Sequence, residues 1–302
     1  RGFIGQHLTK HLLDKYYDVL VLSNIDVQVS SYSKIHKINK IKKIKYNYNS
    51  IKNALKLFLP DRIIYLSGNP SFETSRASFD YDLKATNIVV SYILESIVNL
   101  KLNSTFWFGS SVAVYGNNPK KLTEKSLCKP ISFYGLSKTL AERQCEYYSN
   151  KYNLNIGVIR IFSTYGPGLK RQIVYETIKK FMSKGPFNFF GTGKEIRDII
   201  YIEDLINGIF LLLKKDLKKF KIFNIGTGKG YSINYIVKLI AKEFNIKPNE
   251  IKFLNKNKTR ISSDKSISSI KLIKNITDFE IKYDLYTGIK KTVDYWKKNK
   301  DL

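Results

Sequence analysis

A tyrosine and a lysine four residues apart, Tyr134 and Lys138, are the strongest candidates for chemistry in this sequence. On a helix this spacing places both side chains on one face. A phenol with a reference pKa near 10 is a poor base at neutral pH. A neighbouring ammonium favours the phenolate and lowers its pKa toward the working range. The pair is therefore suited to removing a proton from an alcohol.

A second motif supplies hydroxyl groups. The segment FWFGSSVAVYG, residues 106–116, is predicted to be a strand that runs into a turn carrying Ser110 and Ser111. A serine held beside the tyrosine and lysine would position a substrate hydroxyl for proton transfer. Tyr-x-x-x-Lys alone occurs by chance in many helices, but its combination with this turn indicates a catalytic site.

Two glycines, Gly2 and Gly5, precede the apolar residues of a predicted helix in RGFIGQHLTKHLL. They are typical of the second half of a G-x-x-G-x-x-G turn, in which glycine lets the backbone approach a pyrophosphate at a helix N-terminus. Such a turn follows a central strand of a parallel sheet. We therefore expect the natural protein to carry about ten further N-terminal residues, a short apolar strand and the first glycine.

Apolar β-branched runs alternate with helical patterns, which is typical of a parallel sheet with crossover helices. The predicted strands are Asp18–Leu22, Arg62–Leu66, Thr105–Phe108, Ile156–Ile161 and Ile222–Ile225. The predicted helices are Gln6–Asp14, Ala85–Val98, Tyr134–Lys151, Val174–Ser183, Ile206–Lys214 and Ile233–Phe244, with a final helix that ends at Thr292–Lys297. The sequence thus predicts an α/β protein with a doubly wound parallel sheet in residues 1–165. A smaller C-terminal α/β lobe is predicted for residues 166–302, of which 195–230 partly return to the sheet.

The formal net charge is +27, from 52 Lys and Arg against 25 Asp and Glu. The excess is dispersed lysine, so we expect no nucleic-acid partner but a field that favours anionic small ligands. Two cysteines without C-x-x-C spacing and three histidines predict neither a disulfide framework nor a metal site. Without an apolar run of membrane length or a signal peptide, we expect no membrane partner and a cytoplasmic location.

With these motifs in this order, the chain resembles the extended short-chain dehydrogenase/reductase family, which contains the nucleotide-sugar epimerases and dehydratases. Four further segments, spread over the rest of the chain, carry the resemblance: Arg160–Gly168, Gly191–Leu205, Asn224–Gly228 and Tyr286–Trp296. It implies a Rossmann-like sheet that binds NAD. NADP stays open, because Ser23 stands where NAD enzymes usually offer a carboxylate to the ribose.

The resemblance also implies partners. The substrate would be a nucleotide-diphosphate sugar. A homodimer would form through the helices that carry Thr86–Leu94 and Leu136–Tyr147.

Carried over residue by residue, the resemblance makes Tyr134 the base, Lys138 its partner and Ser111 the residue that holds the substrate hydroxyl. The implied cofactor-binding residues are Gly2, Phe3, Ile4, Gly5, Ser23, Ser67, Gly68, Ser110, Tyr134 and Lys138. The implied substrate-binding residues are Asn69, Ser111, Ser163, Arg197 and Arg260. The two arginines would contact the diphosphate, since a guanidinium suits phosphate oxygens. For Arg197, a structural ion pair with Asp198 or Asp204 is the alternative.

Departures from the family pattern narrow the reaction. Family dehydratases place an Asp-Glu acid pair directly after the hydroxyl residue, where this chain has Val112 and Ala113. With dehydration excluded, the family reactions that remain need only hydride transfer at one carbon of the sugar. We predict a UDP-hexose 4-epimerase that oxidises C4 transiently. The alternative is a nucleotide-sugar 4-ketoreductase or 4-dehydrogenase with net NAD(P)H turnover.

One more departure from the family pattern is Asp82, which stands where the family usually has Asn.

A third class of function is a non-catalytic binding protein on the same scaffold, which the net charge motivates. The intact set of Ser111, Tyr134 and Lys138 argues against that class.

Overall fold

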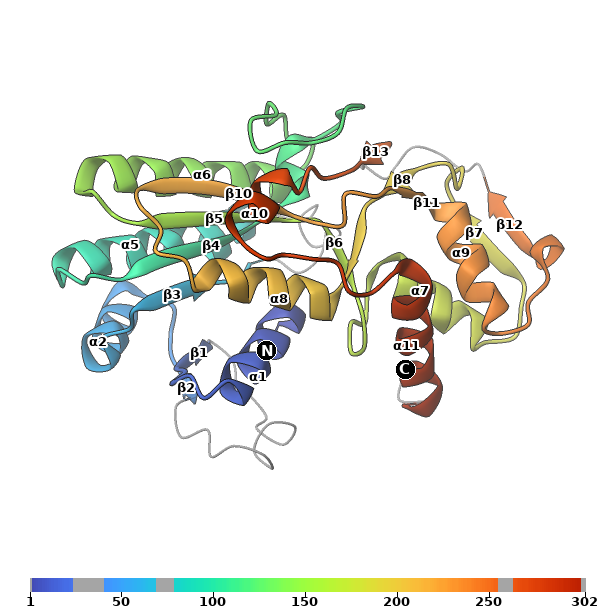
Figure 1. Cartoon of the computed structure of the whole chain (residues 1–302), viewed down its shortest axis with the longest axis horizontal. Coiled ribbons are helices and arrows are strands. Elements are labelled where there is room, and N and C mark those ends of the chain that lie inside the picture. The colour runs from blue at the N-terminus through green and yellow to red at the C-terminus, as the bar shows by residue number, and fades with distance from the viewer. Residues whose placement is uncertain (1, 24–40, 69–78, 255–262, 300–302) are drawn as a thin grey trace. The chain divides into compact units, whose positions relative to one another are not determined.

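The structure, a computed structural model, describes residues 2–23, 41–68, 79–254 and 263–299 (Figure 1). Its helices are α1 Phe3–Asp14, α2 Tyr48–Phe58, α4 Phe79–Asp82, η2 Leu83–Ile88, α5 Val89–Asn99, η3 Val112–Tyr115, α6 Phe133–Tyr152, α7 Gln172–Phe181, α8 Ile202–Leu213, α9 Ile233–Lys242, η4 Pro248–Glu250, α10 Lys271–Ile276 and α11 Leu285–Lys298. Its strands are β1 Val21–Ser23, β2 Ile41–Lys43, β3 Arg62–Tyr65, β4 Thr105–Ser111, β5 Ile156–Ile161, β6 Ser163–Tyr165, β7 Phe187–Phe190, β8 Ile196–Arg197, β9 Ile199–Tyr201, β10 Phe220–Ile225, β11 Tyr231–Ser232, β12 Ile251–Leu254 and β13 Lys265–Ser266.

Two compact units divide the chain. The first consists of residues 1–114, 132–160 and 209–223, and the second of residues 115–131, 161–208 and 224–302. The chain therefore leaves the first unit after β4, returns to it for α6 and β5, and returns again near β10. Residues 115–131 belong to the second unit although they lie inside the range predicted for the sheet domain.

The first unit is built on a sheet with strand order β10-β5-β4-β3. β3 and β4 pair in parallel, with Arg62 opposite Thr105 and Tyr65 opposite Phe108. Helices connect successive strands: η2 and α5 lie between β3 and β4, α6 between β4 and β5, and α8 between β5 and β10. Figure 1 shows α5 and α6 side by side, and the two helices are in contact. The predicted α/β fold with a parallel sheet is confirmed.

Side chains of β4 alternate between the two faces of the sheet. Phe106 and Phe108 join a core cluster with Val90 and Leu94 of α5 and Ala141 of α6. The Trp107 ring lies 6.1 Å from the Phe223 ring and covers the α-carbon of Gly157 on β5. Because both faces of β4 are buried, the end of this strand is a rigid support for Ser110 and Ser111.

Several element boundaries differ from the predicted ones by a few residues, and three differences are larger in kind. The helix α2 was not predicted, although Ile51, Ala54 and Leu55 form its buried face and Asn47 caps its first turn. β1 is shifted toward its C-terminal end relative to the predicted strand. The predicted helix over 85–98 begins in the π-helical segment η2, whose wider turns are not encoded by apolar spacing.

The second unit contains three small sheets, ordered β11-β8-β13, β12-β7 and β6-β9. The helices α7, α9 and α11 pack against one another. Asp198 ties the segments of this unit together, because its fully buried carboxylate accepts hydrogen bonds from Thr227, Gly228 and Ser268.

We predict that Gly157→Ala destabilises the first unit by about 1–3 kcal/mol, the usual cost of overfilling a packed core. The added methyl would lie 2.3 Å from two ring carbons of Trp107. The measurement is urea unfolding followed by tryptophan fluorescence. Gly5→Ala is the control, since a methyl there meets no atom within 4 Å and should leave the midpoint unchanged or raise it. An unchanged midpoint for Gly157→Ala would contradict the prediction.

Candidate active site

Helix α6 carries the candidate base and its partner. Ser132 caps the helix by accepting a hydrogen bond from the Gly135 N–H at 3.1 Å, which fixes the first turn. Tyr134 lies in this turn and is half-buried, whereas Lys138, one turn later, is only 3% exposed. The Lys138 Nζ lies 5.8 Å from the centre of the Tyr134 ring. The expected proximity of the two side chains is therefore present.

Lys138 also connects α6 to β4. Its Nζ donates a hydrogen bond to the Gly109 carbonyl at 2.9 Å and lies 4.8 Å from the centre of the Phe108 ring. Burial lowers the pKa of Lys138 to about 8, and the carboxylates of Asp82 and Glu142 oppose that shift. A lysine with this pKa is mainly charged at neutral pH, but it can lose its proton in mildly alkaline solution.

The hydroxyl residues stand at the end of β4. The Ser111 Oγ accepts a hydrogen bond from the Ala113 N–H at 3.2 Å, which places it at the start of η3. Ser110 is 4% exposed, and its hydroxyl donates to the Glu142 Oε1 at 2.5 Å. Because Ser110 donates its hydroxyl proton to Glu142, a cofactor contact at this residue would have to use the hydroxyl oxygen as an acceptor or the backbone groups.

A buried ion pair supports this corner of the sheet. Arg160 of β5 donates from Nη2 to the Glu142 Oε2 at 2.6 Å and from Nε to the Oε1 at 3.0 Å. From the sequence, Arg160 was identified only as the start of a motif, and no role was predicted for Glu142. The available signal was that Glu142 follows Lys138 by four residues, as Lys138 follows Tyr134.

Gly68 brings the segment after β3 against Lys138. A methyl group at this position would lie 3.2 Å from the Lys138 Nζ and 3.3 Å from the Thr86 Oγ1, and the residue has a φ of +146°. Both the close approach and the backbone conformation require glycine. The neighbouring Ser67 is exposed. The candidate cofactor residues Ser67 and Gly68 therefore lie at the same edge of the first unit as Lys138.

The start of α1 fits a pyrophosphate. Gly2 is the N-cap residue, and no side chain caps the helix. A methyl group at Gly2 or Gly5 would meet no atom of the described residues within 4 Å. Backbone N–H groups and the helix dipole favour an anion at such an end. Phe3 and Ile4 form this turn, and Ser23 is buried at the end of β1.

The remaining candidates lie elsewhere. Asn69 and Arg260 lie outside the described residues, and Ser163 and Arg197 belong to the second unit. Arg197 donates to its neighbour's carbonyl at Ile196. Both carboxylate oxygens of Asp198 accept hydrogen bonds, one from Thr227 and the other from Ser268. The two oxygens of Asp204 accept hydrogen bonds from the backbone N–H groups of residues 282 and 283. A diphosphate contact for Arg197 stays a prediction.

Within the described ranges, no cluster of three or more His, Cys, Asp or Glu residues could hold a metal ion. The helices of the same part of the chain are all too short or too polar to cross a membrane.

Solved structures share this fold. The crystal structure of UDP-glucose 4-epimerase with UDP-glucose from Thermotoga maritima matches with a TM-score of 0.88 at 26% identity, covering 99% of this chain and 97% of that one. The structure of UDP-glucuronic acid 4-epimerase from Bacillus cereus in complex with UDP-glucuronic acid and NAD matches with a TM-score of 0.89 at 23% identity, covering 99% of this chain and 97% of that one. The second likeness concerns the fold alone.

Sequence comparison gives the same family. An uncharacterized UDP-glucose epimerase of Bacillus subtilis, YtcB, is 29% identical over 79% of this chain and 78% of its own. UDP-glucuronate 4-epimerase of Thermodesulfobacterium geofontis is 26% identical over 100% of this chain and 95% of its own. The model of the NAD dependent epimerase/dehydratase family matches residues 1–226, most of the chain. The resemblance is thereby confirmed, and the chain belongs to the NAD dependent epimerase/dehydratase family.

Proposed function

We propose that the protein is an NAD-dependent nucleotide-sugar 4-epimerase that acts on a UDP-hexose. One observation carries the proposal: the buried ammonium of Lys138 donates to the Gly109 carbonyl and lies 5.8 Å from the centre of the Tyr134 ring, and Ser111 follows Gly109 by two residues on β4. Similarity to a UDP-glucose 4-epimerase and to a UDP-glucuronate 4-epimerase supports the reaction and the nucleotide.

NAD is the cofactor of the family to which the chain belongs, and the residues fit it. The start of α1 would hold the pyrophosphate, Gly68 would line the cofactor site, and Lys138 would contact the ribose. When bound, NAD supplies an acceptor that takes a hydride from the sugar carbon and gives it back.

The side chains of α6 and β4 would handle the proton. The Tyr134 oxygen, in its phenolate form, takes the proton of the C4 hydroxyl as the sugar is oxidised and returns it as the sugar is reduced. The Lys138 ammonium stabilises that phenolate electrostatically. Ser111 holds the C4 oxygen in place with its hydroxyl. Arg197 and Arg260 would bind the diphosphate.

The residues after Ser111 argue against elimination. Val112 and Ala113 form the start of η3, directly where a dehydratase would need two acids. Neither side chain can donate or accept a proton. The keto sugar would therefore keep its other hydroxyl groups and be reduced again at C4 from its other face.

Ser23 favours a second candidate function. It ends β1 with a hydroxyl where a carboxylate would select NAD over NADP. A 4-ketoreductase or 4-dehydrogenase would use the same Tyr134 and Lys138 but would consume or produce NAD(P)H. Absorbance at the nicotinamide band during turnover separates the two functions, because an epimerase leaves it unchanged over many cycles.

We predict that the full chain, supplied with NAD, converts UDP-glucose or UDP-N-acetylglucosamine into its C4 epimer. We further predict that Tyr134→Phe lowers kcat by about 10²–10⁴-fold, the usual contribution of a general acid–base group. Nuclear magnetic resonance of the sugar gives the product. Tyr152→Phe, which removes a phenol from the end of the same helix, is the control and should keep full activity. Absence of any C4 epimer would refute the proposed function.

We predict that Gly5→Ala weakens NAD binding about tenfold or more, as expected for loss of about one charge-assisted hydrogen bond. The methyl would fill the space in which the pyrophosphate must approach the backbone. Calorimetric titration with NAD measures the loss, and thermal unfolding without NAD should be unaffected. Gly185→Ala, whose methyl would make an ordinary 3.7 Å contact with Phe187, is the control. Equal NAD affinity in wild type and Gly5→Ala would place the pyrophosphate elsewhere.

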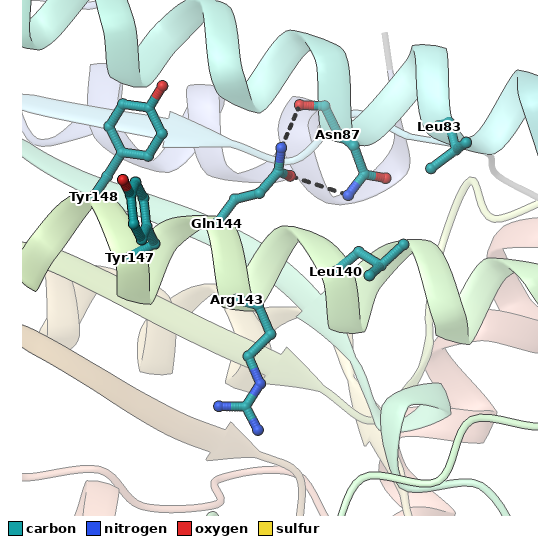
Figure 2. A pocket seen from close by; sticks show the side chains of 7 residues that line it. All are labelled: Leu83, Asn87, Leu140, Arg143, Gln144, Tyr147 and Tyr148. Carbon is teal, nitrogen blue, oxygen red and sulfur yellow. Dashed lines mark hydrogen bonds between the residues drawn. The ribbon is translucent and has the colours of Figure 1, made fainter.

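The homodimer belongs to the same proposal. Figure 2 shows a groove between η2 and α6, lined by Leu83, Asn87, Leu140, Arg143, Gln144, Tyr147 and Tyr148. Leu140 and Tyr147 are 40% and 56% exposed, which leaves apolar surface in water. A second copy related by a two-fold axis would cover this surface with the same helices.

We predict that Leu140→Glu converts the dimer into a monomer, because a charge would be buried without a partner at the interface. Sedimentation velocity at micromolar concentration measures the mass. Leu57→Glu, at a position of α2 that is 75% exposed, introduces the same charge and should leave the dimer intact. A monomeric wild type would contradict the dimer without affecting the proposed reaction.

A further inference from the structure

Glu142 and Arg160 form an ion pair that the proton-transfer scheme above does not use. Glu142 is 5% exposed and Arg160 is 3% exposed, and their side chains meet at 2.6 Å. The guanidinium donates from two nitrogens to both carboxylate oxygens, which is the bidentate geometry that such pairs prefer. This geometry leaves the carboxylate of Glu142 little freedom to move.

The pair continues into the candidate site. Ser110 donates its hydroxyl proton to Glu142 at 2.5 Å, and the Gly109 carbonyl accepts from Lys138 at 2.9 Å. Two consecutive residues of β4 are thus bonded to two consecutive turns of α6. The next residue of the strand is Ser111. A shift of β4 along α6 that moved Ser111 relative to Tyr134 would therefore also break both bonds.

Stability alone does not account for such a pair. Removing two charges from water is costly, and a buried pair is often no more stabilising than apolar residues of similar size. A function that requires the charge itself would explain its presence. Lys138 is a group that requires this charge, because its ammonium is buried one helical turn from Glu142.

The groups that face Lys138 come from several elements. Asp82 lies at the end of α4, Glu142 and Cys145 lie on α6, and the Tyr134 ring lies one turn before Lys138, whereas Arg160 of β5 contacts Glu142. Among these, the carboxylates of Asp82 and Glu142 raise the pKa of Lys138 against the effect of burial. The Glu142 carboxylate is held on two sides by hydrogen bonds from Ser110 and from Arg160.

Resting on the proposed function, we propose that Glu142 is a positioning residue of the reaction. Clamped by Arg160, it holds the end of β4 that carries Ser111. It also supplies the fixed negative charge that keeps the Lys138 ammonium charged beside Tyr134. A purely structural pair would do the first of these but would not affect how Lys138 titrates.

Glu142→Gln tests the charge. In the free protein, the Lys138 pKa should fall from about 8 by about one unit, as expected when a nearby opposite charge is removed. Carbon-13 resonance of the lysine ε-carbons measures it without substrate or cofactor, with Lys138→Arg to assign the signal. The alkaline limb of kcat/KM should move to lower pH by the same amount. Glu176→Gln, at an exposed position of α7, is the matched control and should leave both unchanged.

Ser110→Ala tests the clamp. It leaves both charges in place and removes only the bond from β4 to Glu142, so kcat should fall about tenfold, the equivalent of one hydrogen bond. The Lys138 titration should not change. This variant also decides the matter if Glu142→Gln does not fold.

Two results would each overturn the proposal: a folded Glu142→Gln protein with an unchanged Lys138 titration, or a Ser110→Ala protein with the kcat of wild type. The titration is independent of turnover. A wild type that epimerises no nucleotide sugar would therefore refute the proposed function and still leave the effect of Glu142 on Lys138 measured.

Discussion

Burial of one ammonium group governs the arrangement of this site. Lys138 has left water almost completely, and a charge in that position must be compensated by nearby dipoles and charges. The Gly109 carbonyl, the Phe108 ring and the carboxylates of Asp82 and Glu142 supply the compensation. Phe108 and Gly109 lie on β4, Asp82 on α4 and Glu142 on α6 itself, so satisfying this single charge also fixes the register of α6 against the sheet. The glycine at position 68 follows from the same constraint, because a methyl group there would meet the ammonium.

Strong local patterns made much of this predictable. The strand Ile156–Ile161 has the predicted bounds, and α6 differs by one residue at each end, since both have continuous patterns and clear end signals. The spacing of Tyr134 and Lys138 predicts their proximity because helix geometry is invariant. The helix α2 was missed although local signals were present, because Ile51, Ala54 and Leu55 recur at helical spacing and Asn47 caps the first turn. Its buried face packs on α5.

The supporting network could not be predicted in the same way. Ser110, Glu142 and Arg160 lie on a strand, a helix and the next strand, separated by 32 and 18 residues. Only the order of the strands in the sheet brings them together. The departure at Asp82 was visible in the sequence, but its burial and its effect on Lys138 depend on the helical segment from α4 through η2, which packs on α6. Residue type indicates what a side chain can do, whereas its partners depend on the fold.

The net charge of the chain and the charges of its buried residues have opposite signs. The chain has a net charge of +27, yet the buried charged residues of the described part are four acids, Asp82, Glu142, Asp198 and Asp204, and two bases, Lys138 and Arg160. The positive excess therefore lies outside the core. There it can attract anionic ligands over a distance of about a Debye length, an effect that salt weakens. Selection of a reaction requires fixed charges at hydrogen-bond distance. In this protein those are the buried charges, whose balance is opposite in sign to that of the chain.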